Sequence, residues 1–202
     1  MPDRSEREIW IEFKQGSDSA LSYIYNKYID VLFNYGCQIN NSEQLVQDCI
    51  QDLFMDLIRS RERLADVNSI KYYLFTSLRW RVLKSLKKER KFLSNEFDGT
   101  TEKGFDIISS PEDRMINEQL SKEKRRIITL ACQKLTKKQR ECILLYFYEG
   151  FTYKQVAEIM GMGKVRSARV MVYRALDSLQ AYLKHAKDQL TILTSLLIST
   201  FL

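Results

Sequence analysis

Apolar side chains recur every three or four residues along most of the chain, which is the spacing of an amphipathic helix. The pattern is helical almost throughout from Ile9 to about Leu93. The first stripe consists of Trp10, Phe13, Leu21, Ile24, Tyr25, Tyr28, Leu32 and Phe33. Such a stripe predicts helices that bury one face each against a shared core.

Two further helices are predicted before residue 93. One begins near Asn41, with Gln44 three residues later to complete a reciprocal cap. A polar interruption, Asp66–Ser69, then precedes a helix from Lys71 to about Lys91. The apolar stripe of the former contains Leu45, Cys49, Leu53 and Leu57, and in the latter Leu74 with Phe75 or Leu78 is expected to be core.

The pattern changes between Ser94 and Ser109, where glycines, threonines and acidic residues replace the apolar repeat. This composition is typical of a flexible acidic linker. Helical character resumes at Ser110 and Pro111, which suit an N-cap and a first helical position. The predicted fold class is therefore all-α, with two small helical domains joined by the linker. Its segments are a first domain 1–93, a linker 94–109, a second domain 110–185 and an apolar tail 186–202.

The second domain contains two capping boxes close together. Thr136 and Gln139 open an apolar helix that Gly150 is placed to end, and Thr152 with Gln155 repeats the pattern two residues later. A hydroxyl followed three residues on by Gln satisfies free backbone N–H groups at a helix start. The spacing predicts two short helices in succession.

A turn and a longer helix follow. Phe151 and Val156 are placed as a hydrophobic staple, Ala157 permits close helix packing, and Gly161 suits a turn. The next helix is predicted from Lys164 past Leu179. This arrangement is typical of a helix-turn-helix. An amphipathic hairpin with merely solubilising arginines is the alternative.

The last helix has two distinct faces. Its predicted core face contains Val165, Ala168, Val172, Ala175, Leu176 and Leu179. Arginines near the start of such a helix can pair with guanine in the major groove. The outward residues, our candidates for duplex contact, are Lys164, Arg166, Ser167, Arg169, Val170, Tyr173 and Arg174.

Composition narrows the possible functions. The net charge of +6 and pI near 9.1 are compatible with nucleic-acid binding without establishing it. Four widely spaced cysteines without a CxxC pair predict free thiols in a reducing compartment. A single histidine, His185, and no phosphate loop or nucleophile elbow argue against an enzyme. We expect no cofactor and no metal.

No secretory signal precedes the first helix, and the apolar tail is shorter than the roughly 20 residues that span a bilayer. The tail, Leu190–Leu202, is predicted to be a terminal helix packed on the body of the protein. A cytoplasmic location is expected.

Both halves of the chain resemble one family. Region 4 of the extracytoplasmic-function (ECF) branch of the sigma-70 family is similar to Gln139–Gly161 followed by Ser167–Leu176. Region 2.2 of that family resembles Asp48–Phe54, and its regions 2.3 and 2.4 resemble Tyr73–Arg79. The resemblance spans roughly Ile9–Leu183, in the family's order. It implies a transcription initiation factor that directs RNA polymerase to promoters.

The resemblance also implies roles for individual residues. Region 2.2 binds the clamp coiled coil of core RNA polymerase in this family, region 4 contacts the polymerase flap and the minus-35 duplex, and the linker threads a basic channel. An anti-sigma factor commonly holds such proteins inactive. The implied clamp contacts are Asp48, Gln51, Asp52 and Phe54. The implied minus-10 contacts are Asn68, Tyr72, Tyr73, Arg79, Trp80, Arg81, Lys84, Lys87 and Lys88.

The chain departs from the family pattern in three places. Trp80 and Ile58 stand where relatives commonly have Asn and Trp, the turn after Gly161 is one residue longer, and the apolar tail is additional. A self-sufficient helix-turn-helix regulator that binds duplex DNA as a dimer is the rival hypothesis. It leaves Asp48, Gln51 and the aromatic and basic third helix without a role.

Overall fold

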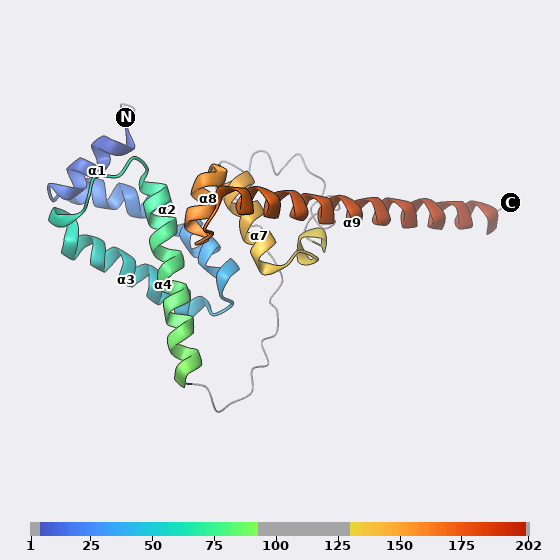
Figure 1. The fold of residues 1–202 in the computed structure, drawn as a ribbon, viewed down its shortest axis with the longest axis horizontal. Helices are drawn as coiled ribbons and strands as arrows, with labels where there is room; N and C mark the ends of the chain where they lie inside the picture. The colour runs from blue at the N-terminus through green and yellow to red at the C-terminus, as the bar shows by residue number, and fades with distance from the viewer. Residues whose placement is uncertain (1–4, 93–129, 201–202) are drawn as a thin grey trace. The chain divides into compact units, whose positions relative to one another are not determined.

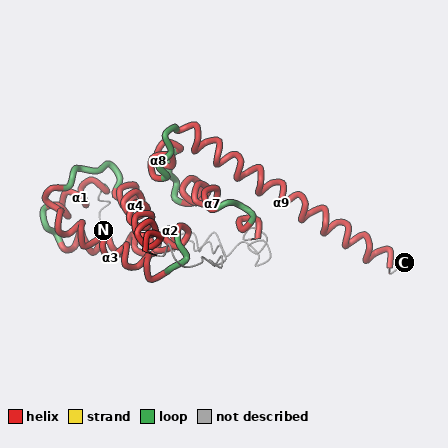
Figure 2. Tube along the Cα trace, turned by 60° about the horizontal axis from the view of Figure 1, so that its bottom comes forward, coloured by secondary structure: helices red, strands yellow, loops and turns green. Residues whose placement is uncertain are grey.

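The computed structural model describes residues 5–92 and 130–200, without the side chains of residues 90–92 and 185–200. The predicted acidic linker, and the helix start predicted at Ser110 and Pro111, lie outside the described residues. The described segments are helical and contain no strand, which confirms the all-α prediction (Figures 1 and 2). The helices are α1 (Glu6–Lys14), α2 (Asp18–Ile39), α3 (Glu43–Ser60), η1 (Arg61–Arg63), α4 (Ile70–Phe92), α7 (Lys137–Ile143), η2 (Leu144–Tyr148), α8 (Tyr153–Ile159) and α9 (Val165–Thr200).

The chain divides into two compact units. The first contains α1 to α4 together with Lys154–Gly163, and the second contains α7, η2 and α9. The boundary predicted near residue 93 lies between α4, the last of the first four helices, and α7 of the second unit. No described helix is long and apolar enough to cross a membrane.

The core of the first unit forms where α4 packs against α1, α2 and α3. Tyr35 of α2 stacks on Phe75 of α4, with ring centroids 4.7 Å apart, and both side chains are fully buried. Gly36 lets α3 approach closely, because a Cβ added there would lie 2.4 Å from the Val46 side chain. The predicted core positions Leu74, Phe75 and Leu78 are all fully buried.

Serines cap the first three helices, one of them at a position that differs from the prediction. Ser42, not Asn41, is the N-cap of α3, and its hydroxyl accepts from the Leu45 N–H. The Gln44 amide does not reach back to complete a reciprocal cap. It donates to Asp48 Oδ1 at 2.9 Å instead. The error is one residue, because Asn41 and Ser42 are both strong capping residues.

The second unit confirms the first of the two predicted capping boxes. Thr136 and Gln139 satisfy each other's backbone N–H groups at the start of α7. The helix then widens into a π-turn, η2, which the apolar spacing did not predict, and Gly150 ends it with φ +70°. The box at Thr152 and Gln155 remains a prediction, since no N-cap of α8 is described.

Gly161 takes the turn conformation that the helix-turn-helix pattern predicts. Its φ is +65°, its N–H donates to the Glu158 carbonyl, and the Met162 N–H donates to the Ala157 carbonyl at 2.7 Å. These two bonds form a Schellman motif, in which a left-handed residue closes the helix end. A side chain at residue 161 would strain this backbone.

Helix α9 has the predicted faces, with two corrections. Ala168, Val172 and Ala175 are fully buried, and α9 packs against α7. Val165 and Leu176, predicted as core, are instead 43% and 36% exposed. Val165 is the first residue of the helix, and Leu176 lies on the flank of the three buried small side chains.

The tail is the continuation of α9 and not a separate helix. Its backbone runs unbroken from Val165 to Thr200, and in Figures 1 and 2 its second half extends past α7. The prediction of a helix is confirmed to Thr200, but within its own unit the segment does not fold back on α7. The four cysteines are in the thiol form and not in disulfides, as predicted.

Candidate polymerase and nucleic-acid interfaces

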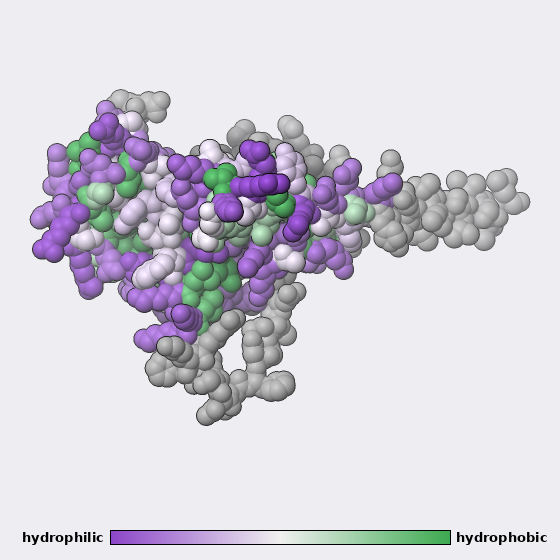
Figure 3. Space-filling view, in the orientation of Figure 1, coloured by the Kyte–Doolittle hydropathy of each residue, from purple (hydrophilic) through white to green (hydrophobic). Residues whose placement is uncertain are grey.

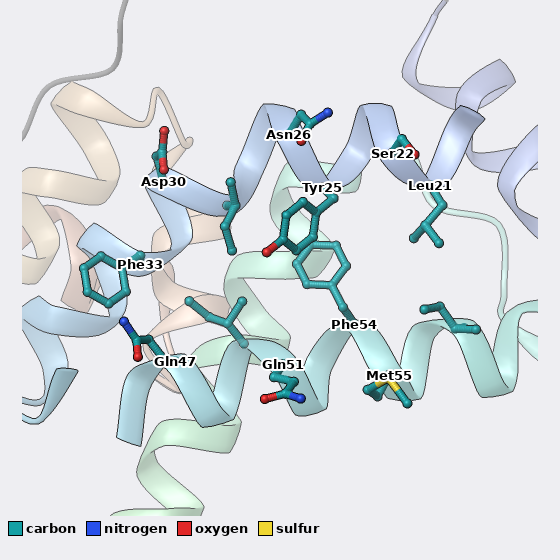
Figure 4. Close-up of a pocket in the computed structure, with 13 residues that line it drawn as sticks. Leu21, Ser22, Tyr25, Asn26, Asp30, Phe33, Gln47, Gln51, Phe54 and Met55 are labelled. Carbon is teal, nitrogen blue, oxygen red and sulfur yellow. The ribbon is translucent and has the colours of Figure 1, made fainter. Parts of the chain in front are cut away.

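A groove of about 800 Å³ lies between α2 and α3. Figure 4 shows Tyr25 of α2 facing Phe54 of α3 across it, in an edge-on contact with ring centroids 5.0 Å apart. Its lining is apolar along the length of both helices, with polar groups at the rim. The apolar lining residues are Leu21, Tyr25, Ile29, Phe33, Ile50, Phe54, Met55 and Ile58.

Three of the four predicted clamp-binding residues are exposed on α3 beside this groove. Asp48, Gln51 and Asp52 follow i, i+3, i+4 spacing and therefore share one side of the helix. Phe54 is different, because only 5% of it is exposed and it lies beneath Tyr25. A partner in the groove would meet Phe54 as part of its floor.

Sequence reasoning named Met55 and Ile58 in no binding role, yet both are exposed beside the predicted residues. They are 41% and 38% exposed, and Tyr25 across the groove is 45% exposed. Figure 3 shows apolar side chains, in green, that break the polar surface on the face it presents. Exposed large apolar side chains gathered in a groove are typical of a site for a partner protein.

The loop before α4, which carries the exposed Asn68, is held from α1 at three points. The Trp10 indole N–H donates to the Ala65 carbonyl at 3.0 Å. Lys14 Nζ lies 2.6 Å from Asp66 Oδ1, and this pairing lowers the pKa of Asp66. The Glu6 carboxylate accepts from the Ile70 N–H at 3.0 Å and so caps the start of α4.

Glu6 is itself fixed by α2. The Tyr28 hydroxyl donates to the other Glu6 oxygen in a short hydrogen bond, and Lys27 Nζ lies 3.7 Å away. Burial is the larger cause, and the hydrogen bond to Glu6 the smaller, of a Tyr28 pKa that lies well above its ordinary value. The hydroxyl therefore keeps its proton and remains a donor. Sequence reasoning missed Glu6 and Trp10, since neither the cap of a helix 64 residues away nor the indole bond has a local signal.

The predicted minus-10 residues on α4 divide into exposed and engaged side chains. Trp80 is 59% exposed, with Lys84 Nζ 4.5 Å above its ring, and Lys87 and Lys88 are also exposed. A flat exposed ring beside several cations can stack on an unpaired base while the cations bind phosphate. Arg79, Tyr72 and Tyr73 are only half-exposed.

Three of these predicted residues contact the protein itself, and the first is Tyr72, whose hydroxyl donates to Glu158 Oε2 at 2.6 Å. Arg81 Nη2 donates to Asp56 of α3 at 2.8 Å, and its Nε is buried without a hydrogen-bond partner in the described structure. Tyr73 packs against Trp10, with ring centroids 5.4 Å apart. Arg81 and Tyr73 therefore hold α4 against its neighbouring helices, and their side chains do not project freely into solvent. The alternation of aromatic and basic residues could not separate these roles.

The predicted duplex-facing residues of α9 are all exposed. This set consists of Lys164, Arg166, Ser167, Arg169, Val170, Tyr173 and Arg174. The Arg169 guanidinium lies 5.4 Å from the centre of the Tyr153 ring, and Tyr153 stacks on Tyr146 at 4.3 Å. A hydrogen bond with Tyr146, together with burial, raises the pKa of Tyr153 to about 12. Tyr153 was missed because a single tyrosine at the start of a helix carries no signal.

No group of three or more potential metal ligands is found among the described residues. What the described side chains offer is an apolar groove between α2 and α3, an aromatic and basic helix α4, and an exposed basic segment at the start of α9.

Comparisons with known proteins identify the family. The family model described as sigma-70 region 2 matches residues 24–92, and the one described as sigma-70, region 4, matches residues 125–179. An ECF RNA polymerase sigma factor, SigK, from Mycolicibacterium vanbaalenii is 27% identical over 113 residues. The chain belongs to the sigma-70 family. The alignment covers 55% of this chain and 56% of SigK, so the chain spans about half the length of that curated relative.

Two solved structures share the fold of this sigma-70 family chain. CnrH, solved in complex with the cytosolic domain of CnrY, superposes with a TM-score of 0.55 at 18% identity. The match covers 90% of this chain and 99% of CnrH. The sigma factor RpoE from Bartonella quintana, solved with the anti-sigma factor NepR, gives a TM-score of 0.59 at 22% identity, covering 86% of this chain and 97% of RpoE.

Proposed function

We propose that the chain is a transcription initiation factor, which binds core RNA polymerase, directs it to specific promoters and is not itself an enzyme. The observation that carries this proposal is the presence of sigma-70 regions 2 and 4 on one chain, in that order. A lone helix-turn-helix regulator needs no region 2. The groove and the exposed aromatic and basic helix of the first unit then have distinct tasks.

The groove between α2 and α3 is the proposed site for the clamp coiled coil of the polymerase. Its apolar floor suits the apolar stripe of a helix, and a helix laid in a groove is a common mode of recognition. Asp48, Gln51 and Asp52 at the edge provide hydrogen-bond acceptors and charge that would select basic residues on the partner.

The loop 64–69 and α4 are the proposed minus-10 site. Asn68 is our candidate for reading an extruded base, because the three contacts from α1 hold this loop in place while its side chain stays exposed. Trp80 would stack on a neighbouring unpaired base. Strand opening costs a few kcal/mol per unstacked step, which such stacking offsets.

The start of α9 is the proposed minus-35 site. Arg169 is the central candidate, since contact with the Tyr153 ring restricts its guanidinium before DNA arrives. Restriction of a side chain in the free protein reduces the entropy lost on binding.

The proposed location is the cytoplasm, and the proposed regulator is an anti-sigma factor. CnrH and RpoE were each solved with a partner, CnrY and NepR respectively, and NepR is described as an anti-sigma factor. The fold shared with both proteins supports a regulator of the same class here.

Transcription by the reconstituted enzyme tests the main proposal. Purified chain is mixed with core RNA polymerase and genomic DNA fragments, and the 5′ ends of the transcripts are sequenced. We expect a set of start sites that depends on the chain and shares two upstream sequence elements. If the chain joins the core enzyme but adds no start site, or never joins it, the proposal is wrong.

The clamp assignment has its own test. Asp48→Ala combined with Gln51→Ala should lower the affinity for core polymerase several-fold and leave the helical circular dichroism spectrum unchanged. Arg59→Ala, an exposed residue of the same helix, is the matched control and should bind normally. Equal affinities for the two variants would place the polymerase elsewhere on the chain.

A further inference from the structure

The π-turn η2 has no part in the proposed function. Its widened turn closes where the Glu149 N–H donates to the Leu144 carbonyl, five residues back, at 3.0 Å. Turns of this kind interrupt the regular ladder of an α-helix, are rare, and occur frequently at functional sites. The residues of η2, and those that they contact, are therefore candidates for a role in recognition.

Tyr146 of η2 is held by two aromatic contacts. Its ring stacks on that of Tyr153, the first residue of α8, with centroids 4.3 Å apart and an interplanar angle of 13°. The ring of Phe147 meets it edge-on, with centroids 4.9 Å apart and an angle of 88°. Both kinds of contact stabilise a pair of rings and restrict how each can turn. The π-turn thus carries a tyrosine that fixes the ring at the start of α8.

Tyr153 in turn contacts the basic segment at the start of α9. The guanidinium carbon of Arg169 lies 5.4 Å from the centre of the Tyr153 ring. The hydrogen bond with Tyr146, then burial and the nearby Tyr173, raise the pKa of Tyr153 to about 12, so Tyr173 also lies beside this side chain. Arg169 and Tyr173 are exposed, whereas Tyr153 is half-buried. A half-buried ring that the π-turn holds therefore supports an exposed cation.

The contact with Tyr153 restricts Arg169 without using its hydrogen-bond donors. An aromatic face attracts a guanidinium electrostatically and needs no directed bond from its N–H groups. The Arg81 guanidinium differs, because it already donates to Asp56. Bidentate pairing with guanine requires two N–H donors of one guanidinium. The contact with the ring thus leaves the donors of Arg169 available for a base while its side chain is restrained.

We propose that Tyr146 and Tyr153 are positioning residues for base recognition by Arg169. The π-turn fixes Tyr146, the stacked pair fixes the ring of Tyr153, and this ring orients the guanidinium before duplex DNA arrives. This role rests on the proposed minus-35 contact of α9, to which it adds the residues that set specificity. A side chain ordered in advance loses less entropy on binding. Because orientation serves pairing with bases and charge alone serves phosphates, loss of the ring should cost more affinity on a cognate duplex than on a scrambled one.

NMR spectroscopy of the full-length chain tests the positioning without DNA or polymerase. The Arg169 Nε–H signal, assigned by its loss in Arg169→Lys, reports side-chain mobility through 15N relaxation. In the wild type it should be less mobile than that of Arg174, an exposed arginine of the same helix. Tyr153→Leu and Tyr146→Leu should raise the mobility of Arg169 to the level of Arg174, and the matched control Tyr182→Leu should not. Equal mobility of the two arginines in the wild type overturns the proposal, whether or not the chain starts transcripts.

Duplex binding tests the consequence for specificity. The probe is a duplex that the full-length chain selects from a random pool, and its scrambled version is the comparison. Tyr153→Leu should lower affinity for the selected duplex by roughly two- to fivefold, the value of an exposed cation–π contact, and for the scrambled duplex by less. Tyr153→Phe keeps the ring and should retain most of the affinity, while Tyr153→Leu added to Arg169→Ala should cause no further loss. A further loss of the same size in the double variant, or equal losses on both duplexes, would show that Tyr153 does not act through Arg169.

Discussion

Helices α4 and α9 are both long and basic, but they are supported very differently. Helix α4 packs against α1, α2 and α3, and some of its polar side chains are tied to these neighbours, as Arg81 is to Asp56. Helix α9 packs against α7, and the basic residues from Arg166 to Lys184, within the part whose side chains are described, are exposed. The difference suggests that α4 is built to hold an aromatic surface rigidly for unpaired bases. By contrast, in the proposed function the start of α9 presents its basic side chains to the major groove of DNA.

The buried side of α4 should dominate the stability of the first unit. Leu74→Ala removes a fully buried side chain, and we expect the free energy of unfolding to fall by about 2–5 kcal/mol. Leu83→Ala on the same helix is the control. It is 40% exposed and should cost less than about 1 kcal/mol. Urea denaturation followed by circular dichroism measures both, and similar losses would mean that α4 is not held as described.

Replacing Trp80 should weaken binding to single-stranded DNA, whereas replacing Arg169 should weaken binding to duplex DNA. Trp80→Ala removes a stacking surface worth about 1–3 kcal/mol per base, so affinity for a single-stranded minus-10 oligonucleotide should fall roughly tenfold or more. Arg169→Ala should lower affinity for the minus-35 duplex by about 1–3 kcal/mol and leave the single strand unaffected. Fluorescence anisotropy with both DNAs gives all four values.

The controls for this pair lie within the same measurement. Each variant serves as the control of the other, because one acts on the first unit and the other on the second. Arg169→Ala should also lose more on the cognate than on a scrambled duplex. Equal losses of affinity on both duplexes would mean that Arg169 contacts phosphate and does not read bases.

Salt dependence should distinguish free cations from engaged ones. Lys88→Ala removes an exposed cation of α4 and should reduce the slope of log affinity against log salt by about 1 unit or less. Arg81→Met should leave that slope nearly unchanged and lower the melting temperature instead, because Arg81 binds Asp56. If Arg81→Met changes the slope as much as Lys88→Ala does, Arg81 reaches DNA despite its ion pair.

The smallest effect concerns the link between α1 and the loop before α4. Since Lys14 lowers the pKa of Asp66 in the folded chain, the pair stabilises the protein above the ordinary pKa of the carboxyl, 3.8. That contribution is lost as the pH falls through the lowered value. Lys14→Met should return the pKa of Asp66 toward its ordinary range, as measured by NMR titration. Lys87→Met, far from the pair in sequence, should not, and an unmoved Asp66 in Lys14→Met would rule out the contact.

The helices and their core were predictable because their signals are local. Three- and four-residue spacing identified the buried face of α3 and most of the buried faces of α2 and α9. Tyr25, predicted in the core stripe of α2, is instead 45% exposed. A hydroxyl–amide pair located the start of α7. The errors occurred where neighbouring residues compete for one role, as Asn41 and Ser42 do for the cap of α3. Val165 and Leu176 were misassigned because spacing defines a face and not how far the partner helix extends along it.

Of the candidate sites, the sequence predicted which side chains are exposed but not how they are linked to neighbouring helices. Exposure of Asp48, Gln51 and the recognition face of α9 follows from helical periodicity. The links from Glu6 to Ile70, Arg81 to Asp56 and Arg169 to Tyr153 depend on how helices meet, which no local pattern contains. The apolar groove likewise needs two helices at a fixed spacing before it exists.

The carboxylate of Glu6 gives the beginning of the chain an influence on a distant segment. A fusion tag placed directly ahead of Ser5, or a protease cut within α1, would disturb the contacts that α1 makes with the start of α4 and with the loop that carries Asn68. Preparations that differ only in their leader sequence could then differ in promoter opening while binding polymerase equally well. A long spacer before residue 5 should keep such preparations equivalent.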